Sequence, residues 1–204
     1  MGVKKEVVKL KDKSPDFILC LVLGIGLGIV SKYLDTVAVD GSWLTNFLHF
    51  LGNLFTRLGI WVFIAALVAA YSKTMRGAAI NTFVFFIGML ISYYAFSAFL
   101  FGFFPTSYFI LWGGIALLSP LLAVVVWKAK NNGRLSMILP ALPLGLLLSL
   151  SLSIGLFYID VTHYEELIMY AFLCLVFYKN QKQIVVSIGL SVIISIIIRI
   201  SSLY

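Results

Sequence analysis

The longest uncharged stretch of the sequence, Ala78 to Phe104, limits the fold more than any other segment. It reads AAINTFVFFIGMLISYYAFSAFLFGFF and lies between Arg76 and Pro105. About 20 apolar residues in a helix are enough to cross the roughly 30 Å hydrocarbon core of a bilayer. A soluble domain of this size has nowhere to bury a helix that is apolar on nearly every side. We therefore predict a transmembrane helix here.

The rest of the chain extends this prediction to a whole helical bundle. The 204 residues are 62% hydrophobic and 11% charged, whereas soluble domains carry about 25% charged residues. Six further apolar segments are predicted to span the membrane: Phe17–Tyr33, Leu58–Tyr71, Tyr108–Trp127, Leu135–Phe157, Leu167–Tyr178 and Ile184–Ile198. We predict an all-α integral membrane protein, with residues 17–204 forming one domain of seven, alternatively six, transmembrane helices. If the last two short segments form one re-entrant pair, five full crossings remain.

One additional helix is predicted to lie at the membrane surface. In Trp43–Arg57, WLTNFLHFLGNLFTR, an apolar stripe that includes Trp43 and Phe47 lies opposite polar residues that include His49 and Asn53. Such amphipathicity is typical of an interfacial or re-entrant helix. We expect this helix to lead directly into the span that follows it.

The distribution of charge predicts the orientation of the bundle. Twelve of the fifteen basic residues fall on the side of residues 1–16, and only Lys32, Arg57 and Arg199 fall on the other side. Because basic residues are concentrated in cytoplasmic loops, we predict a multi-pass protein of the cell membrane with a cytoplasmic N-terminus and a cytoplasmic basic arm at residues 1–16. The net charge of +7 is thus explained by topology, and we expect no nucleic-acid partner.

Both histidines, His49 and His163, are predicted on the outer face. The carboxylates there are Asp35, Asp40, Asp160, Glu165 and Glu166. Histidine with carboxylates is able to bind a metal or relay protons. However, the sequence contains no HxxxH, HExxH or CxxC spacing, and acidic outer loops are ordinary. We expect no metal and no cofactor.

A second group of candidates lies in and near the long span. Asn81, Ser92, Tyr93, Tyr94 and Ser97 form its polar lining, and Trp112 and the Ser119–Pro120 step follow in the next span. They predict either hydrogen bonds between helices or an aromatic pocket for a planar or amphipathic small molecule. The candidate ligand-binding residues are Trp43, His49, Tyr93, Tyr94, Trp112 and His163.

Two glycines of the first span predict close packing between helices. Gly24 and Gly28 lie four residues apart, so they share one helix face, where another backbone can approach closely. The contact is predicted either within the chain or with a partner.

Several functional classes are disfavoured by what the sequence lacks. It has no nucleotide-binding loop, no convincing catalytic triad and no charged residue in the middle of a span. These absences argue against a primary pump and favour a protein that is not an enzyme.

Two resemblances add expectations. The segments GLGIVSKYLD and FFIGMLISYYAFSAFLFGFFPTSYFILWGGIALLSP resemble small bacterial multi-pass membrane proteins of unknown function. In size, orientation and aromatic outer half, the chain also resembles the substrate-binding subunits of energy-coupling-factor vitamin transporters. That resemblance implies an outward-opening pocket beneath the loop at Leu34–Trp43, and a partner membrane subunit at Gly24 and Gly28. Those subunits usually have six helices, a cytoplasmic C-terminus and alanine at the small pair.

Taken together, these patterns predict a small-molecule binding or transport subunit with an outward-facing aromatic pocket. Its expected partners are the lipid bilayer and either another membrane protein or a transporter module. The alternative is a non-catalytic accessory or immunity-type protein that docks on another membrane protein.

Overall fold

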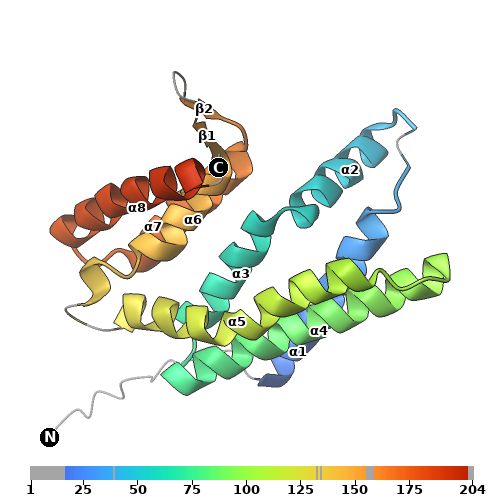
Figure 1. Cartoon of the computed structure of the whole chain (residues 1–204), viewed down its shortest axis with the longest axis horizontal. Coiled ribbons are helices and arrows are strands. Elements are labelled where there is room, and N and C mark those ends of the chain that lie inside the picture. The colour runs from blue at the N-terminus through green and yellow to red at the C-terminus, as the bar shows by residue number, and fades with distance from the viewer. Residues whose placement is uncertain (1–16, 39, 132, 134, 155–158, 202–204) are drawn as a thin grey trace, which may run out of the picture.

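The computed structural model describes residues 17–201 except residues 39, 132, 134 and 155–158. The predicted basic arm at residues 1–16 lies outside this part of the chain. The described residues form α-helices, one short 3-10 turn and one small hairpin (Figure 1). The elements are α1 (Phe17–Leu34), α2 (Trp43–Thr56), α3 (Leu58–Ala70), α4 (Met75–Phe101), α5 (Thr106–Asn131), η1 (Leu135–Met137), α6 (Ala141–Ser151), β1 (Leu152–Ile154), β2 (Ile159–Val161), α7 (Tyr164–Phe177) and α8 (Gln181–Ser201).

Helices α1, α4 and α5 form one half of the molecule. Helix α4 packs against both of the others, and it is joined to α5 by a tight turn that begins at Gly102, whose φ of 69° favours glycine. The predicted close contact of Gly24 and Gly28 is made with α4. A Cβ atom on Gly24 would meet the backbone of Phe85 and Met89, and one on Gly28 would meet Met89 and Ser92. The small pair is therefore used inside the chain.

Helices α2 and α3 are two parts of a broken helix. They meet at Arg57, whose extended backbone (φ −84°, ψ 149°) both ends α2 and precedes α3. The two axes differ by 69°. The Trp61 indole bridges the break by donating a hydrogen bond to the Phe55 carbonyl oxygen at 2.8 Å. The predicted helix at Trp43–Arg57 is confirmed as a helix, and the break falls at its last residue.

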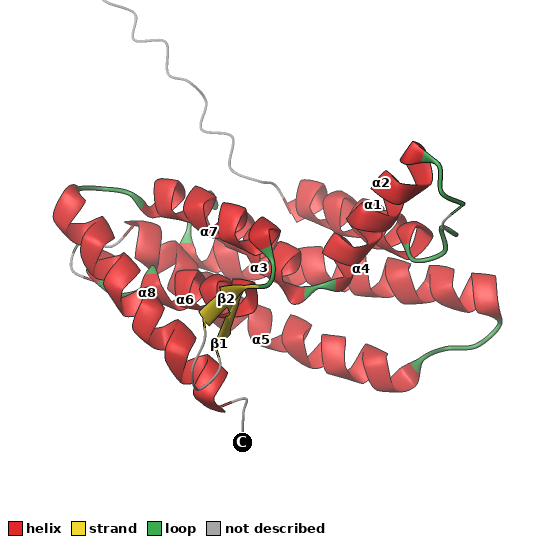
Figure 2. Ribbon diagram, turned by 90° about the horizontal axis from the view of Figure 1, so that it is seen from above, coloured by secondary structure: helices red, strands yellow, loops and turns green. Residues whose placement is uncertain are grey.

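Helices α6, α7 and α8 form the other half of the molecule (Figures 1 and 2). The sequence predicts one long helix over Leu135–Phe157, but the structure has η1, a turn, the 11-residue α6 and then β1. Proline explains the late start, because Pro140 precedes α6 and Pro143 occupies its first turn, where a missing N–H is tolerated. After Ser151 the chain turns into β1, which pairs antiparallel with β2.

Helix α8 presents a polar stripe to its own half of the molecule. Gln183, Ser187, Ser191 and Ser195 recur every fourth residue and are buried. The Gln183 amide donates to the Ser136 carbonyl oxygen at 3.0 Å, and the Ser187 hydroxyl donates to the Met137 carbonyl oxygen at 3.0 Å. These bonds fasten the first turns of α8 to η1.

The lengths of the helices identify a membrane protein. Among the described residues, α1, α4, α5 and α8 are long and apolar enough to cross a bilayer, and α2 with α3 makes a fifth if the bent pair is one span. Helices α6 and α7, with 11 and 14 residues, are shorter than the roughly 20 residues that a straight crossing needs. Large apolar side chains are exposed along α1, α5 and α8, as expected for surfaces that contact lipid.

Charged loops gather at opposite ends of the bundle. At one end, the Lys130 ammonium lies 3.5 Å from the ring centre of Tyr71, and the Trp127 indole donates to the Ser72 carbonyl oxygen at 3.0 Å. These contacts join two of the loops predicted on the cytoplasmic side. Elsewhere, Arg57 contacts Glu165 and Glu166, which joins residues predicted on the outer side.

Candidate functional site

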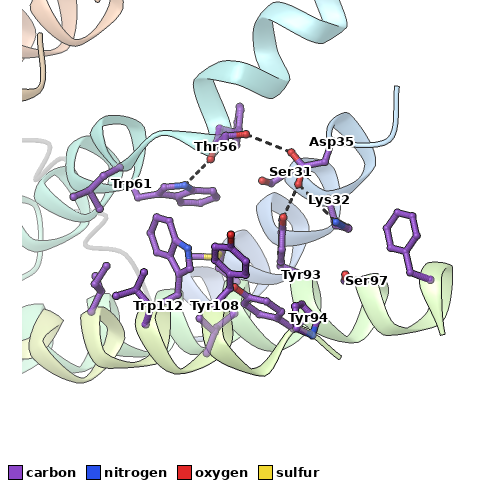
Figure 3. Close-up of a pocket in the computed structure, with 18 of the residues that line it drawn as sticks. Ser31, Lys32, Asp35, Thr56, Trp61, Tyr93, Tyr94, Ser97, Tyr108 and Trp112 are labelled. Carbon is purple, nitrogen blue, oxygen red and sulfur yellow. Dashed lines mark hydrogen bonds and ion pairs between the residues drawn. The ribbon is translucent and has the colours of Figure 1, made fainter. Parts of the chain in front are cut away.

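A cavity with a volume of about 870 Å³, within the range of small-molecule sites, is the candidate ligand site of the described structure. It lies between the C-terminal end of α1, the α2–α3 break, the second half of α4 and the start of α5 (Figure 3). Its lining residues are Ser31, Lys32, Asp35, Phe55, Thr56, Leu58, Trp61, Met89, Leu90, Tyr93, Tyr94, Ser97, Phe101, Phe103, Pro105, Tyr108, Leu111, Trp112 and Ile115.

Aromatic rings make up eight of the nineteen lining residues. Trp61 comes from α3, Tyr93 and Tyr94 from α4, and Trp112 from α5 (Figure 3). The rings are held by their neighbours: Trp61 meets Phe55 edge-on at 5.6 Å between centres, and Tyr93 meets Tyr94 edge-on at 5.0 Å. Edge-to-face pairs of this kind fix ring orientation, so the wall is preorganised to contact a flat or apolar molecule.

One corner of the cavity contains a charge-balanced cluster around Asp35. One oxygen of this carboxylate accepts the hydroxyl of Tyr93 at 2.5 Å, and the other accepts the hydroxyl of Thr56 at 3.4 Å. The Lys32 ammonium lies 3.9 Å from the carboxylate and 5.1 and 4.9 Å from the ring centres of Tyr93 and Phe101. Because the lysine and the aspartate neutralise each other, the corner adds no net charge to the site.

Four hydroxyl groups around the cavity are free to bind a ligand. Ser31, Tyr94, Ser97 and Tyr108 line the cavity, and their side chains make no hydrogen bond within the part of the chain that the structure describes. Ser31, Tyr94 and Ser97 are also buried within the fold. Because these residues line the cavity and their hydroxyls are left for a ligand to bind, this set favours a ligand with polar atoms of its own.

A second cluster lies around the α2–α3 break. Arg57 Nη2 is 3.1 Å from Glu165 Oε2, and Arg57 Nε is 3.1 Å from Glu166 Oε1. Glu166 is only 1% exposed, and it packs so closely on Gly59 that a Cβ there would lie 2.5 Å from the Glu166 Cγ. His163, Glu165 and Glu166 bring possible metal-ligating atoms within 4.8 Å of one another. However, Arg57 already engages both carboxylates, so the cluster is best described as an ion-pair anchor that joins the break to α7.

The structure brings together half of the predicted ligand-binding residues. Tyr93, Tyr94 and Trp112 line the cavity. Trp43 is 80% exposed at the start of α2 and stacks on Phe47. His49 lies on α2, with its Nδ1 3.4 Å from the side-chain amide of Asn53, and His163 precedes α7 beside the glutamates.

Sequence reasoning missed the charged corner of the cavity. Hydropathy places Lys32 at the end of a span and Asp35 in a loop, although the three-residue spacing puts both on one helix face. That spacing at the end of an apolar helix is a signal that the sequence contains. Two of the predicted polar residues of the long span have structural partners: Asn81 donates to Ser72 at 3.2 Å, and Ser92 donates to the Met89 carbonyl oxygen at 3.1 Å.

Comparison with known proteins places the chain in a family. No curated protein and no solved structure matches it. The pattern of one protein family, described as a family of unknown function (DUF6518), matches residues 8–201. This match covers nearly the whole sequence, so the chain belongs to the DUF6518 family.

Proposed function

We propose that the protein is a small-molecule binding or transport subunit of the cell membrane, with the cavity between α1, α3, α4 and α5 as its ligand site. The observation that carries this proposal is an aromatic cavity of about 870 Å³ lined by hydroxyls without partners in the described part of the chain. Such a lining suits a planar or amphipathic molecule with an apolar body and hydrogen-bonding groups. The neutral Lys32–Asp35 pair favours a molecule without net charge.

The proposal includes an orientation and a topology. With a cytoplasmic N-terminus and seven spans, the cavity opens in the outer half of the membrane, because it lies at the C-terminal ends of α1 and α4. The contacts between the two basic loops, at Tyr71–Ser72 and Trp127–Lys130, support one cytoplasmic end. Labelling intact cells with a membrane-impermeant maleimide tests this: Ala38→Cys, at an exposed position after α1, should react and Lys73→Cys should not. The reverse pattern would contradict the outward opening.

Transport would require a second component. The sequence has no nucleotide-binding loop, so energy from ATP would have to come from a partner module, as the resemblance to vitamin-transporter subunits implies. The α2–α3 break beside the cavity is the kind of discontinuous helix that forms substrate sites in transporters. Stoichiometric recovery of an ATP-hydrolysing complex from native membranes would favour transport over simple binding.

Binding itself is tested with purified protein in nanodiscs. A broad set of metabolites and lipids is screened by native mass spectrometry and thermal stabilisation. A ligand of the cavity should bind about 10- to 30-fold more weakly to the Trp112→Ala variant, because about 1.5–2 kcal/mol of aromatic contact is lost. Trp43→Ala is the matched control, since Trp43 lies outside the cavity. Absence of any ligand, or equal weakening in both variants, would count against the proposal.

The accessory-protein alternative needs a different docking surface from the one that the sequence suggests. Gly24 and Gly28 are covered by α4, so a partner would have to bind another surface, such as the exposed apolar side of α1, α5 or α8. A stoichiometric membrane partner recovered without any ligand would favour this alternative.

A further inference from the structure

A second cavity lies next to the first and has a different chemistry. Its volume is about 300 Å³, and it lies between α3, α4, α5, α6 and α8. The lining is almost wholly aliphatic. The exceptions are Phe86 and the hydroxyls of Thr82 and Ser119, of which Ser119 is satisfied by the Ala116 carbonyl oxygen at 2.8 Å. The cavity therefore offers little to a polar group and much to a hydrocarbon chain.

The two cavities share part of their lining. Leu58, the first residue of α3, and Ile115 of α5 line both of them. Along α5, Trp112 lines the first cavity, Ile115 lines both, and Ser119 lines the second. Residues three and four apart lie on one helix face. One continuous face of α5 therefore runs from the aromatic cavity to the aliphatic one, and the side chains of Leu58 and Ile115 separate them.

The position of this partition is fixed by the helix break. Arg57, the residue before Leu58, is held by Glu165 and Glu166 of α7. Thr56, which precedes Arg57, contacts Asp35, the residue that follows α1. Leu58 thus starts from an anchored backbone, while both side chains of the partition are aliphatic and only half-buried. Side chains of this type change rotamer on a picosecond-to-nanosecond timescale where they are accessible, so the partition is able to admit a narrow chain.

We propose that the two cavities form one site for a single-chain amphiphile with an uncharged, hydroxyl-bearing head group. The head binds the free hydroxyls of the first cavity, and the chain passes between Leu58 and Ile115 into the second. The first cavity has hydroxyl groups where the head group would bind, and the second cavity is aliphatic where the chain would lie. The two cavities therefore match the two parts of such a molecule. This inference rests on the proposed function, because it assumes that the first cavity binds a ligand, and it adds the class of that ligand.

A chain of a bulk lipid is the competing occupant of the second cavity. Leu122 and Leu142 line this cavity and are exposed on the surface of the fold. In a membrane they contact hydrocarbon, so a lipid chain has access from the side. A test must therefore distinguish a chain that enters from the first cavity from one that enters from the bilayer.

Photolabelling of the wild-type protein in nanodiscs makes this distinction. Two monoacylglycerol probes with 16-carbon chains are used, one with a diazirine beside the head group and one with it at the chain end. The first should label residues of the first cavity. The second should label α6 and α8 near Leu146 and Ile194. Excess unlabelled glycerol ether with a six-carbon chain should displace both probes, because it competes for the head-group position.

Ile115→Trp fills the partition and tests the path itself. In this variant we expect labelling of the second cavity by the chain-end probe to fall at least tenfold. A six-carbon glycerol ether that carries its own diazirine beside the head group should still label the first cavity. Leu117→Trp is the matched control, because Leu117 lies on α5 and is exposed outside both cavities. Leu58→Phe obstructs the same point from α3 and replaces Ile115→Trp if that variant does not fold.

The outcomes separate the inference from the proposed function. Absence of head-group labelling in the first cavity with every probe contradicts binding of this ligand class there, and a ligand of another class found in the screen would leave the proposed function standing. Head-group labelling without chain-end labelling of the second cavity overturns the shared site alone. Chain-end labelling that resists the short-chain competitor, or that persists in Ile115→Trp, shows a bulk lipid in the second cavity and also overturns it.

Discussion

The contact between α1 and α4 should be intolerant of a single methyl group at Gly24. An ideal Cβ on Gly24 would lie 3.0 Å from the carbonyl carbon of Phe85, closer still to its oxygen, and 3.1 Å from the amide nitrogen of Met89. Ordinary van der Waals contact begins at 3.4 Å, and all three atoms belong to the backbone of α4. Neither helix can relieve the overlap by turning a side chain, so the two helices must move apart.

The expected magnitude follows from two opposed effects. Overpacking of a rigid contact costs about 1–3 kcal/mol, whereas replacing glycine by alanine in a helix gains at most about 1 kcal/mol. Gly26 provides the matched control, because it lies on the same helix and a Cβ there would meet nothing within 4 Å. We expect Gly26→Ala to be neutral or stabilising. Because the gain in helix propensity is common to both variants, the free energy of unfolding of Gly24→Ala should be about 1–3 kcal/mol lower than that of Gly26→Ala.

The assay is reversible unfolding of the purified protein in mixed micelles of dodecyl maltoside and sodium dodecyl sulfate, followed by circular dichroism. Because α1 leads into Asp35 and α4 carries Tyr93, the same separation should weaken ligand binding in the first cavity. A free energy of unfolding for Gly24→Ala within about 0.5 kcal/mol of that for Gly26→Ala would refute the close approach of the two helices.

Three further outcomes are expected. Arg57→Met should lower the free energy of unfolding by about 3 kcal/mol or more in the same assay, because it leaves the buried Glu166 carboxylate unpaired; a loss below about 1 kcal/mol would contradict the anchor. Gln183→Leu should cost about 1 kcal/mol, because buried backbone and hydroxyl acceptors lose their donor, and an unchanged midpoint would speak against the α8–η1 contact. Hydrogen bonds from the Thr45 hydroxyl and the Ser42 amide lower the pKa of the Asp40 carboxyl group from 3.8 to about 2. The ionised carboxylate should therefore stabilise the first turn of α2 fully above about pH 4, and this stabilisation should be lost as the pH falls from about 4 to 2. Carbon-13 NMR of the Asp40 carboxyl group as a function of pH measures this pKa. In Thr45→Val the titration midpoint should move back toward about 4. A midpoint near 4 in the wild-type protein would refute the hydrogen bonds.

The sequence was sufficient to predict most of the helices but not their interruptions. Hydrophobic length alone located α4, α5 and α8, and amphipathicity located α2. The prediction of a single helix over Leu135–Phe157 was wrong. Prolines at 140 and 143 moved the start of α6 inward. The pairing of β1 with β2, a local feature that hydropathy does not report, follows the end of α6 at Ser151.

The candidate site was predicted in part for the same physical reason. Tyr93, Tyr94 and Trp112 are aromatic residues near helix ends, so a pocket there follows from composition and span boundaries. The packing of Gly24 and Gly28 against α4 determines which side of α1 faces these aromatic residues. The inclusion of Lys32 and Asp35 therefore requires the tertiary structure, as does the second cavity.

The break at Arg57 has a mechanical consequence. Helix α3 contacts α4 and α5 in one half of the molecule and α6 and α7 in the other. The two residues before α3 bind to different halves: Thr56 donates a hydrogen bond to Asp35, which follows α1, and Arg57 forms ion pairs with α7. Any rocking of one half against the other must therefore twist the backbone at this point. The peptide unit between Thr56 and Arg57, beside the first cavity, is therefore the point where such a motion would be concentrated.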